Sequence, residues 1–111
     1  MGRTLARDQL EAVAGQFGVL AEPTRLAILQ SLREGGRSVG ELVVELEAKQ
    51  ANISKQLGVL FSAGLVGRER HGNEVHYSIR DPMIFELCEL VCGKIRRDAE
   101  RQAEAFRPRR R

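Results

Sequence analysis

Apolar residues recur every three or four positions through the first 62 residues, a spacing typical of amphipathic helices. The first such stretch has its apolar stripe at Leu10, Val13, Ala14 and Phe17. Proline and glycine divide the region, because proline suits the first turn of a helix and paired glycines end one. Four helices are therefore predicted. The first covers residues 5–20, and the second begins at Pro23 and stops at the sequence Glu34-Gly35-Gly36. A short third helix follows Ser38, and a longer fourth runs from Lys49 or Gln50 to about Ser62.

Two of these helix ends carry specific signals. Ser38 is followed three residues later by Glu41, which is the spacing of a capping box. Gly64 lies just beyond the fourth helix, where a glycine accepts the left-handed conformation that commonly ends helices. Both signals fix the limits of the third and fourth helices.

After Gly64 the apolar period changes from about 3.6 to 2, which indicates strands. Residues 65–70 form one predicted strand and residues 75–80 a second, with Gly72 and Asn73 as the centre of a tight turn. In that register His71 lies opposite Glu74, and His76 opposite Glu69, so the two histidines are not a direct cross-strand pair. A last helix is predicted from Asp81 and Pro82 to about Phe106.

The order of these elements predicts a winged helix-turn-helix. A short capped helix followed after a few residues by a longer helix is the helix-turn-helix arrangement, and the hairpin directly after it is the wing. The predicted fold class is mainly α with a small β-hairpin wing (α+β). Residues 1–107 are expected to form one domain, and residues 108–111 an arginine-rich tail.

The fourth helix would present a polar face that suits DNA. Asparagine and glutamine can pair with adenine in the major groove, small residues allow close approach, and serine and lysine reach phosphates. The residues predicted to bind DNA on or next to this helix are Lys49, Gln50, Ala51, Asn52, Ser54, Lys55 and Gln56. Those predicted on the wing are Arg68, Arg70, His71 and Asn73. A solvated polar face is the alternative interpretation, and the order of the elements favours DNA.

Composition narrows the class of protein. The chain has 111 residues, of which 42% are hydrophobic and 30% charged, as expected for one globular domain. It has two cysteines, no apolar run of about 20 residues and no secretory signal at its start, so we expect a cytoplasmic protein that does not enter membranes. Residues 94–111 carry eight basic and three acidic residues, a net charge of +5, whereas residues 1–93 carry ten basic and twelve acidic residues, so the total is +3. Net charge alone therefore predicts no polyanionic partner.

Four motifs in order carry a family resemblance. They are Val19 to Leu29 with the sequence VLAEPTRLAIL, Gln50 to Leu60 with QANISKQLGVL, Ala63 to Val66, and Val75 to Ile79. Together they resemble the opening, recognition helix and wing of the ArsR/SmtB family of winged-helix repressors, over roughly residues 10–95. The chain departs from the family pattern at Lys49, where a capping serine or threonine is frequent, at Gln56, where histidine is frequent, and at His76, where tyrosine is frequent.

The resemblance implies a homodimer that pairs through its first and last helices. Two recognition helices would enter successive major grooves of an imperfect palindrome, and an inducer would release the operator DNA. The two best-known metal sites of the family are not expected here. Ser38 and Gly40 stand where one site has its cysteine pair. Asp81, Met83, Lys94 and Arg97 stand where the other has aspartate and histidine, and only Asp81 matches.

Cys88 and Cys92 lie four residues apart on one face of the last helix, together with Ile84, Leu87, Val91 and Ile95. They are candidates for a thiol sensor that takes As(III), Cd(II) or Cu(I), or that responds to oxidation or reactive sulfur. A disulfide within the helix would be strained, because residues i and i+4 have Cβ atoms about 5–6 Å apart. The alternative is that both are small apolar residues of the subunit interface with no chemical role.

Two further function classes compete with DNA binding. A winged helix can serve as a protein-interaction module without operator binding, although such a face should show exposed apolar anchors. A thiol oxidoreductase would need an activated cysteine near a helix start, usually in a Cys-x-x-Cys motif, and the spacing here differs. The sequence thus predicts a non-enzymatic DNA-binding regulator with no assured cofactor.

Overall fold

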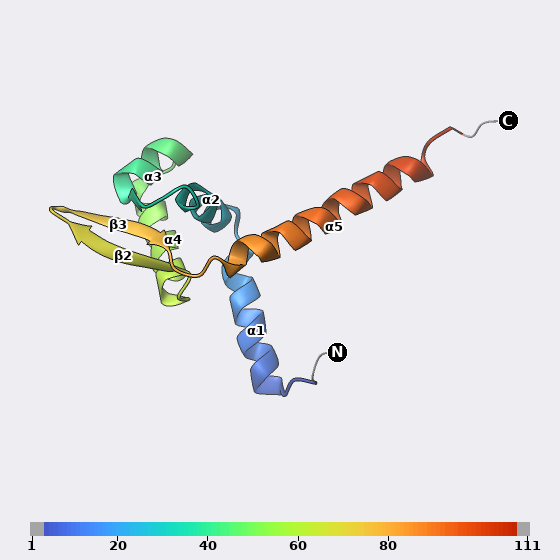
Figure 1. Ribbon diagram of the computed structural model, residues 1–111, viewed down its shortest axis with the longest axis horizontal. Helices are drawn as coiled ribbons and strands as arrows, with labels where there is room; N and C mark the ends of the chain where they lie inside the picture. Colours follow the sequence, from blue (N-terminus) through green and yellow to red (C-terminus); the bar gives the residue numbers. More distant parts are fainter. Residues whose placement is uncertain (1–3, 109–111) are drawn as a thin grey trace. The chain divides into compact units, whose positions relative to one another are not determined.

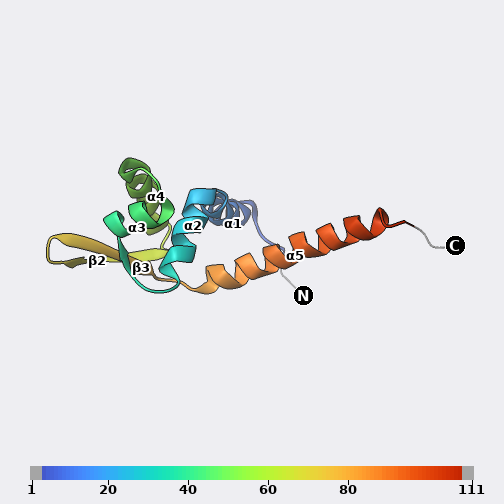
Figure 2. The same cartoon turned by 90° about the horizontal axis from the view of Figure 1, so that it is seen from above.

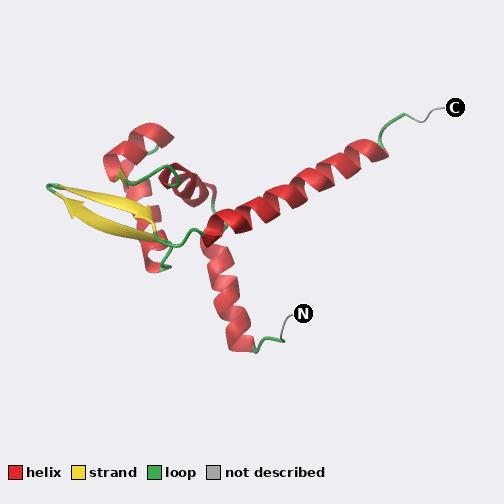
Figure 3. Cartoon of the chain, viewed as in Figure 1, coloured by secondary structure: helices red, strands yellow, loops and turns green. Residues whose placement is uncertain are grey.

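The structure, a computed structural model, describes residues 4–108. Within these residues, five helices and three strands follow each other. Figures 1 and 3 show the helices and the β-hairpin between the fourth and the last helix. Their bounds are α1 Arg7–Leu20, α2 Pro23–Leu32, β1 Arg37–Ser38, α3 Val39–Leu46, α4 Gln50–Ser62, β2 Val66–His71, β3 Glu74–Ile79 and α5 Met83–Ala105. The chain divides into two compact units, one ending at Asp81 and one beginning at Pro82.

The first unit has its core where α2, α3 and α4 meet the base of the sheet. Its side chains with at most 4% exposure are Ile28, Leu29, Leu32, Leu42, Ile53, Leu57, Leu60, Leu65 and Val66. Each helix contributes the apolar residues of one stripe, as the helical spacing predicted. In Figure 2 the hairpin of β2 and β3 extends away from these helices. The core thus fixes α4 and the hairpin to one small scaffold.

Local signals set the ends of these helices. Pro23 begins α2, and Glu22 before it accepts a hydrogen bond from the Arg25 backbone N–H through its side chain. Ser38 and Glu41 form the predicted capping box: Glu41 N donates to Ser38 Oγ over 3.1 Å, and Ser38 N to Glu41 Oε1 over 2.8 Å. Gly64 follows α4 with a φ of 79°. The predicted starts of α2 and α3 are confirmed.

The capping box also affects the ionisation of Glu41. The Ser38 backbone N–H donates to the carboxylate and lowers the pKa of Glu41 below its ordinary value. Because a lowered pKa favours the charged form in the folded state, this carboxylate stabilises the fold above its ordinary pKa. That contribution is lost as the pH falls through the lowered pKa.

Substituting the capping serine tests the contribution of this helix start. We expect Ser38→Ala to lower the free energy of unfolding by about 1 kcal/mol, because the Glu41 N–H loses its acceptor. Urea denaturation followed by circular dichroism measures the change. Ser62→Ala, an exposed serine at the end of α4, is the control and should leave the midpoint nearly unchanged. Equal midpoints for the two variants would show that the cap does not stabilise α3.

The sheet has three strands in the order β1-β3-β2, all antiparallel. The predicted hairpin register is confirmed, with His71 opposite Glu74 and Glu69 opposite His76. The turn glycine, Gly72, has a φ of 66°. Strand β1 was missed by the sequence analysis: Arg37 pairs with Tyr77 and Ser38 with His76. A Cβ on Gly36 would lie 3.3 Å from the Tyr77 carbonyl oxygen, so glycine allows this approach. The wing is therefore anchored to the start of α3.

Helix α5 makes up most of the second unit and has 23 residues, close to the predicted last helix. It carries exposed apolar side chains along its length, including Leu90, Val91 and Ile95. Within the described residues, no helix combines the length and apolar character needed to cross a bilayer. Of the predicted tail 108–111, residues 109–111 lie outside the described part of the chain.

Candidate nucleic-acid interface

Helices α3 and α4 form the helix-turn-helix. Three residues, Glu47 to Lys49, join them, and Glu47 adopts a left-handed conformation with a φ of 50° that ends α3. Lys49 precedes α4 without capping it through its side chain. With Ile53, Leu57 and Leu60 buried, the opposite face of α4 is turned to solvent.

The exposed face of α4 holds five of the predicted DNA-binding residues. They are Gln50, Ala51, Asn52, Ser54 and Lys55, and Lys49 just before the helix is exposed as well. No acidic residue lies within α4. The surface therefore combines amide groups, small side chains and cations in the half of the helix next to the turn. Such a set can read base edges and contact phosphates in a major groove.

Gln56 is not on this exposed face, contrary to the sequence prediction. Its side chain is buried, at 6% exposure. Arg25 Nη1 donates to Gln56 Oε1 over 2.6 Å, and Gln56 Nε2 donates to Asn52 Oδ1 over 3.0 Å. Residues 53, 56, 57 and 60 share one face of a helix, so the helical period puts Gln56 on the buried stripe. The period therefore indicates its burial better than its amide chemistry does. Gln56 thus lies behind the exposed face of α4 and orients Asn52 through a hydrogen bond.

Arg25, which the sequence analysis did not single out, joins this polar chain to the end of α1. Its Nε donates to the Val19 carbonyl over 2.6 Å and its Nη2 to the Gly18 carbonyl over 3.3 Å. These carbonyls belong to the last turn of α1, where helical acceptors lack partners within the helix. The signal in the sequence was an arginine in the first turn of an apolar helix, but its partner Gln56 is 31 residues away.

The two faces of the wing differ in chemistry. Arg68 and Arg70 share one face, and the Arg68 guanidinium lies over the Phe61 ring of α4, 4.0 Å from its centroid. His71 lies on the other face with Glu69, since side chains alternate along a strand. Arg68, Arg70, His71 and Asn73 are all exposed. The structure therefore brings the two arginines together and separates His71 from them.

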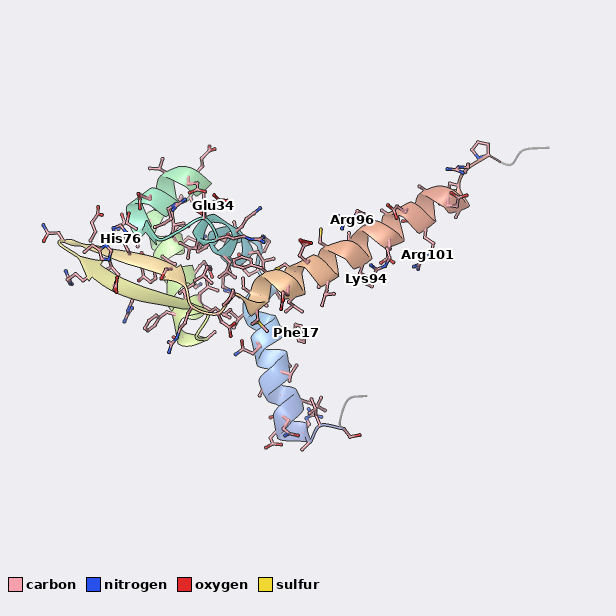
Figure 4. All side chains as sticks on the ribbon, in the orientation of Figure 1. Phe17, Glu34, His76, Lys94, Arg96 and Arg101 are labelled. Carbon is pink, nitrogen blue, oxygen red and sulfur yellow. The ribbon has the colours of Figure 1, made fainter. Side chains whose placement is uncertain are left out.

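The two wing histidines touch although they are not directly opposite. Their rings stack with centroids 4.5 Å apart, because a diagonal pair lies within reach across an antiparallel ladder. His71 Nε2 is 3.0 Å from Glu69 Oε1, and His76 Nε2 is 3.3 Å from Glu74 Oε1. Figure 4 shows His76 on the hairpin. Among residues 4–108, no group of three or more histidine, cysteine, aspartate or glutamate side chains could hold a metal ion.

The candidate sensor thiols, Cys88 and Cys92, are free and exposed on α5. Arg96 Nη1 lies 3.9 Å from the Cys92 sulfur, whereas Lys94 pairs with Asp98. Figure 4 labels Lys94, Arg96 and Arg101 along this helix. The structure thus places a guanidinium beside one of the two thiols.

Comparison with known proteins gives the family. The sequence profile described as "Bacterial regulatory protein, arsR family" matches residues 22–67. The chain is 49% identical over 76 residues to Rv0081 of Mycobacterium tuberculosis, an uncharacterized HTH-type transcriptional regulator. The aligned region covers 68% of this chain and 67% of that protein. The chain belongs to the ArsR family. The resemblance found in its motifs is confirmed.

Solved structures of ArsR-type regulators share the fold. The crystal structure of Rv0081 matches with a TM-score of 0.79 at 37% identity, covering 88% of this chain and 99% of that one. The antimony-specific transcriptional repressor AntR matches with a TM-score of 0.74 at 32% identity, covering 90% and 92%. A homodimeric winged helix-turn-helix DNA-binding domain, Mb0332 of Mycobacterium bovis, matches at 0.69 and 28%, covering 99% and 100%. This ArsR-family chain is a winged-helix DNA-binding transcriptional repressor and not an enzyme.

Proposed function

We propose that this chain is a homodimeric repressor that binds an imperfect palindromic operator and leaves it when a thiophilic inducer reacts at Cys88 and Cys92. It would act in the bacterial cytoplasm, on the nucleoid. The observation that carries the DNA-binding part is the exposed face of α4, where Asn52 and Lys55 stand opposite the buried Ile53 and Leu57. The basic face of the wing, with Arg68 and Arg70, would contact the backbone beside it.

We propose that a second copy of the chain buries the exposed apolar residues of α1 and α5 in a dimer interface. None of the residues of α1 is buried, and its stripe of Leu10, Val13 and Phe17 is 42–53% exposed. On α5, Val91 and Ile95 are 48% and 62% exposed. Apolar stripes of this kind on two separate helices are costly in water and mark an interface. A dimer would also place two α4 helices for two half-sites about one helical turn apart.

The proposed inducer is a soft metal ion or metalloid, such as As(III), Cd(II) or Cu(I), or a reactive sulfur or oxidising species. Cys88 and Cys92 are exposed, and a dimer contributes four such thiols. Thiolates are the ligands that soft ions prefer. The fold neighbour AntR is an antimony-specific repressor, and antimony belongs to the same thiophilic class.

Fluorescence anisotropy with DNA from upstream of the gene tests the function. The reduced protein should bind this fragment far more tightly than a scrambled duplex of the same length. Affinity should fall steeply as salt rises, because lysine and arginine contacts release counterions from phosphates. Equal affinity for the two duplexes would contradict operator binding. Absence of any binding would favour a protein-interaction role for the fold.

Serine substitutions test the sensor thiols. We expect Cys88→Ser and Cys92→Ser each to bind the upstream fragment as the native protein does, because the cysteines lie on α5 and not on α4. Each variant should need at least about tenfold more As(III) or Cd(II) for release, because a soft ion loses one thiolate ligand. The response to polysulfide should weaken too, because one of the two thiols it can modify is gone. Anisotropy titrations with each agent measure this. Release at native concentrations in both variants would make the cysteines structural residues only.

A further inference from the structure

The hydrogen-bonded chain from Arg25 through Gln56 to Asn52 has a fixed direction. A guanidinium has only donors, so the Gln56 atom 2.6 Å from Arg25 Nη1 must be its oxygen. The Gln56 amide nitrogen then faces Asn52 at 3.0 Å, and the Asn52 atom that receives it must be Oδ1. Each amide in the chain is therefore held in one of its two orientations.

This direction determines what Asn52 offers to DNA. Its oxygen is turned toward the buried Gln56, and its Nδ2 has no partner within residues 4–108. The Asn52 group left wholly free for a base is thus a donor. The familiar bidentate pairing of asparagine with adenine uses both its oxygen and its nitrogen. Here one of the two lone pairs of the Asn52 oxygen already accepts from Gln56, so the nitrogen is the stronger candidate to contact the base.

We propose that Gln56, held by Arg25, determines the base preference of this regulator by making Asn52 a hydrogen-bond donor. Asn52 would read an acceptor in the major groove: N7 or O6 of guanine, O4 of thymine, or N7 of adenine. Gln56 and Arg25 are positioning residues, because they act through Asn52 and do not reach the base. The proposal rests on the proposed function, since it requires α4 to lie in a major groove.

Reversing the donor at position 56 should reverse the preference. In Gln56→Glu the side chain keeps its size and still accepts from Arg25, but a carboxylate cannot donate to Asn52. Asn52 would turn, donate its Nδ2 to the carboxylate and present Oδ1 outward. The variant should then prefer a donor edge, N4 of cytosine or N6 of adenine. Gln56→Met, similar in length and without polar atoms, should leave Asn52 unoriented.

Selection from a library of randomised DNA duplexes, followed by sequencing, measures these preferences. Asn52→Ala first identifies the base pair that Asn52 reads, as the position whose preference disappears. At that position the native protein and Gln56→Glu should prefer different base pairs, or the same pair with its two bases on exchanged strands, each by at least about fivefold. Gln56→Met should show less than half of the native discrimination. Because preferences are ratios within one library, a general loss of affinity from the added carboxylate does not affect them, and lower salt can restore binding.

The outcomes of this selection distinguish a failure of the inference about Gln56 from a failure of the proposed operator binding. An unchanged preference at the Asn52 position in both Gln56 variants would overturn the inference. If Gln56→Glu does not give a native circular dichroism spectrum, an unchanged preference in Gln56→Met alone would overturn it. A native protein that enriches no sequence would overturn operator binding itself, and the inference with it.

Discussion

Replacing Asn52 and Lys55 together by alanine should abolish sequence-specific DNA binding and leave a folded dimer. Both side chains are exposed on α4, so their removal opens no cavity in the core. A good base contact contributes about 1–3 kcal/mol of discrimination. A dimer loses it in both half-sites, which gives a loss of about 30-fold to 10⁴-fold from Asn52 alone. The loss of Lys55 should reduce the salt dependence as well.

Anisotropy with the upstream fragment measures this loss, and circular dichroism with light scattering checks that the variant is folded and dimeric. A matched control is Ser62→Ala with Arg97→Gln, which also changes one exposed residue at the end of α4 and removes one positive charge. The control should bind within about threefold of the native protein. Native affinity in the Asn52 and Lys55 variant would place the reading surface elsewhere.

A single charge on the apolar stripe of α5 should separate the dimer. Ile95 is 62% exposed in the single chain. In a dimer that covers α5, Ile95→Glu would bury an unpaired carboxylate, at a cost of several kcal/mol. Light scattering should give the mass of one chain, 12.4 kDa, whereas the native protein should give twice this value. Operator affinity should fall at least about 100-fold, because a monomer holds only one half-site.

Arg97→Gln is the matched control for this experiment too. It lowers the charge of the chain by one, as Ile95→Glu does, on the far side of the same helix from the Ile84, Val91 and Ile95 stripe. It should remain dimeric and bind DNA. A dimeric Ile95→Glu variant at micromolar concentration would show that α5 does not carry the subunit interface.

Features coded by near neighbours in sequence could be predicted. The capping box of Ser38 and Glu41, the start of α2 at Pro23 and the turn at Gly72 each depend on residues within four positions. The apolar stripe of α4 and the register of the hairpin followed from simple periods. Motifs assembled from these elements were enough to find the family.

Features that join distant segments could not be predicted. Strand β1 has two residues and exists only because β3, almost forty residues later, pairs with it. The chain from Arg25 to Gln56 spans 31 residues, and the Arg68 guanidinium meets Phe61 across the junction of helix and strand. Gln56 is the instructive case, because its period placed it inside while its chemistry suggested a surface role. The helical period accounts for its burial, but its hydrogen bonds become predictable only when its partners, Arg25 and Asn52, are known.

The most direct test of the account is a methylation-protection footprint on the upstream DNA. Dimethyl sulfate modifies guanine N7, which lies in the major groove where α4 is proposed to sit. We predict protection of guanines in two patches about 10 base pairs apart, centre to centre, related by the symmetry of a dimer. The protection should disappear with the Asn52 and Lys55 double substitution. A bound complex in which guanine N7 stays reactive throughout would contradict recognition by α4.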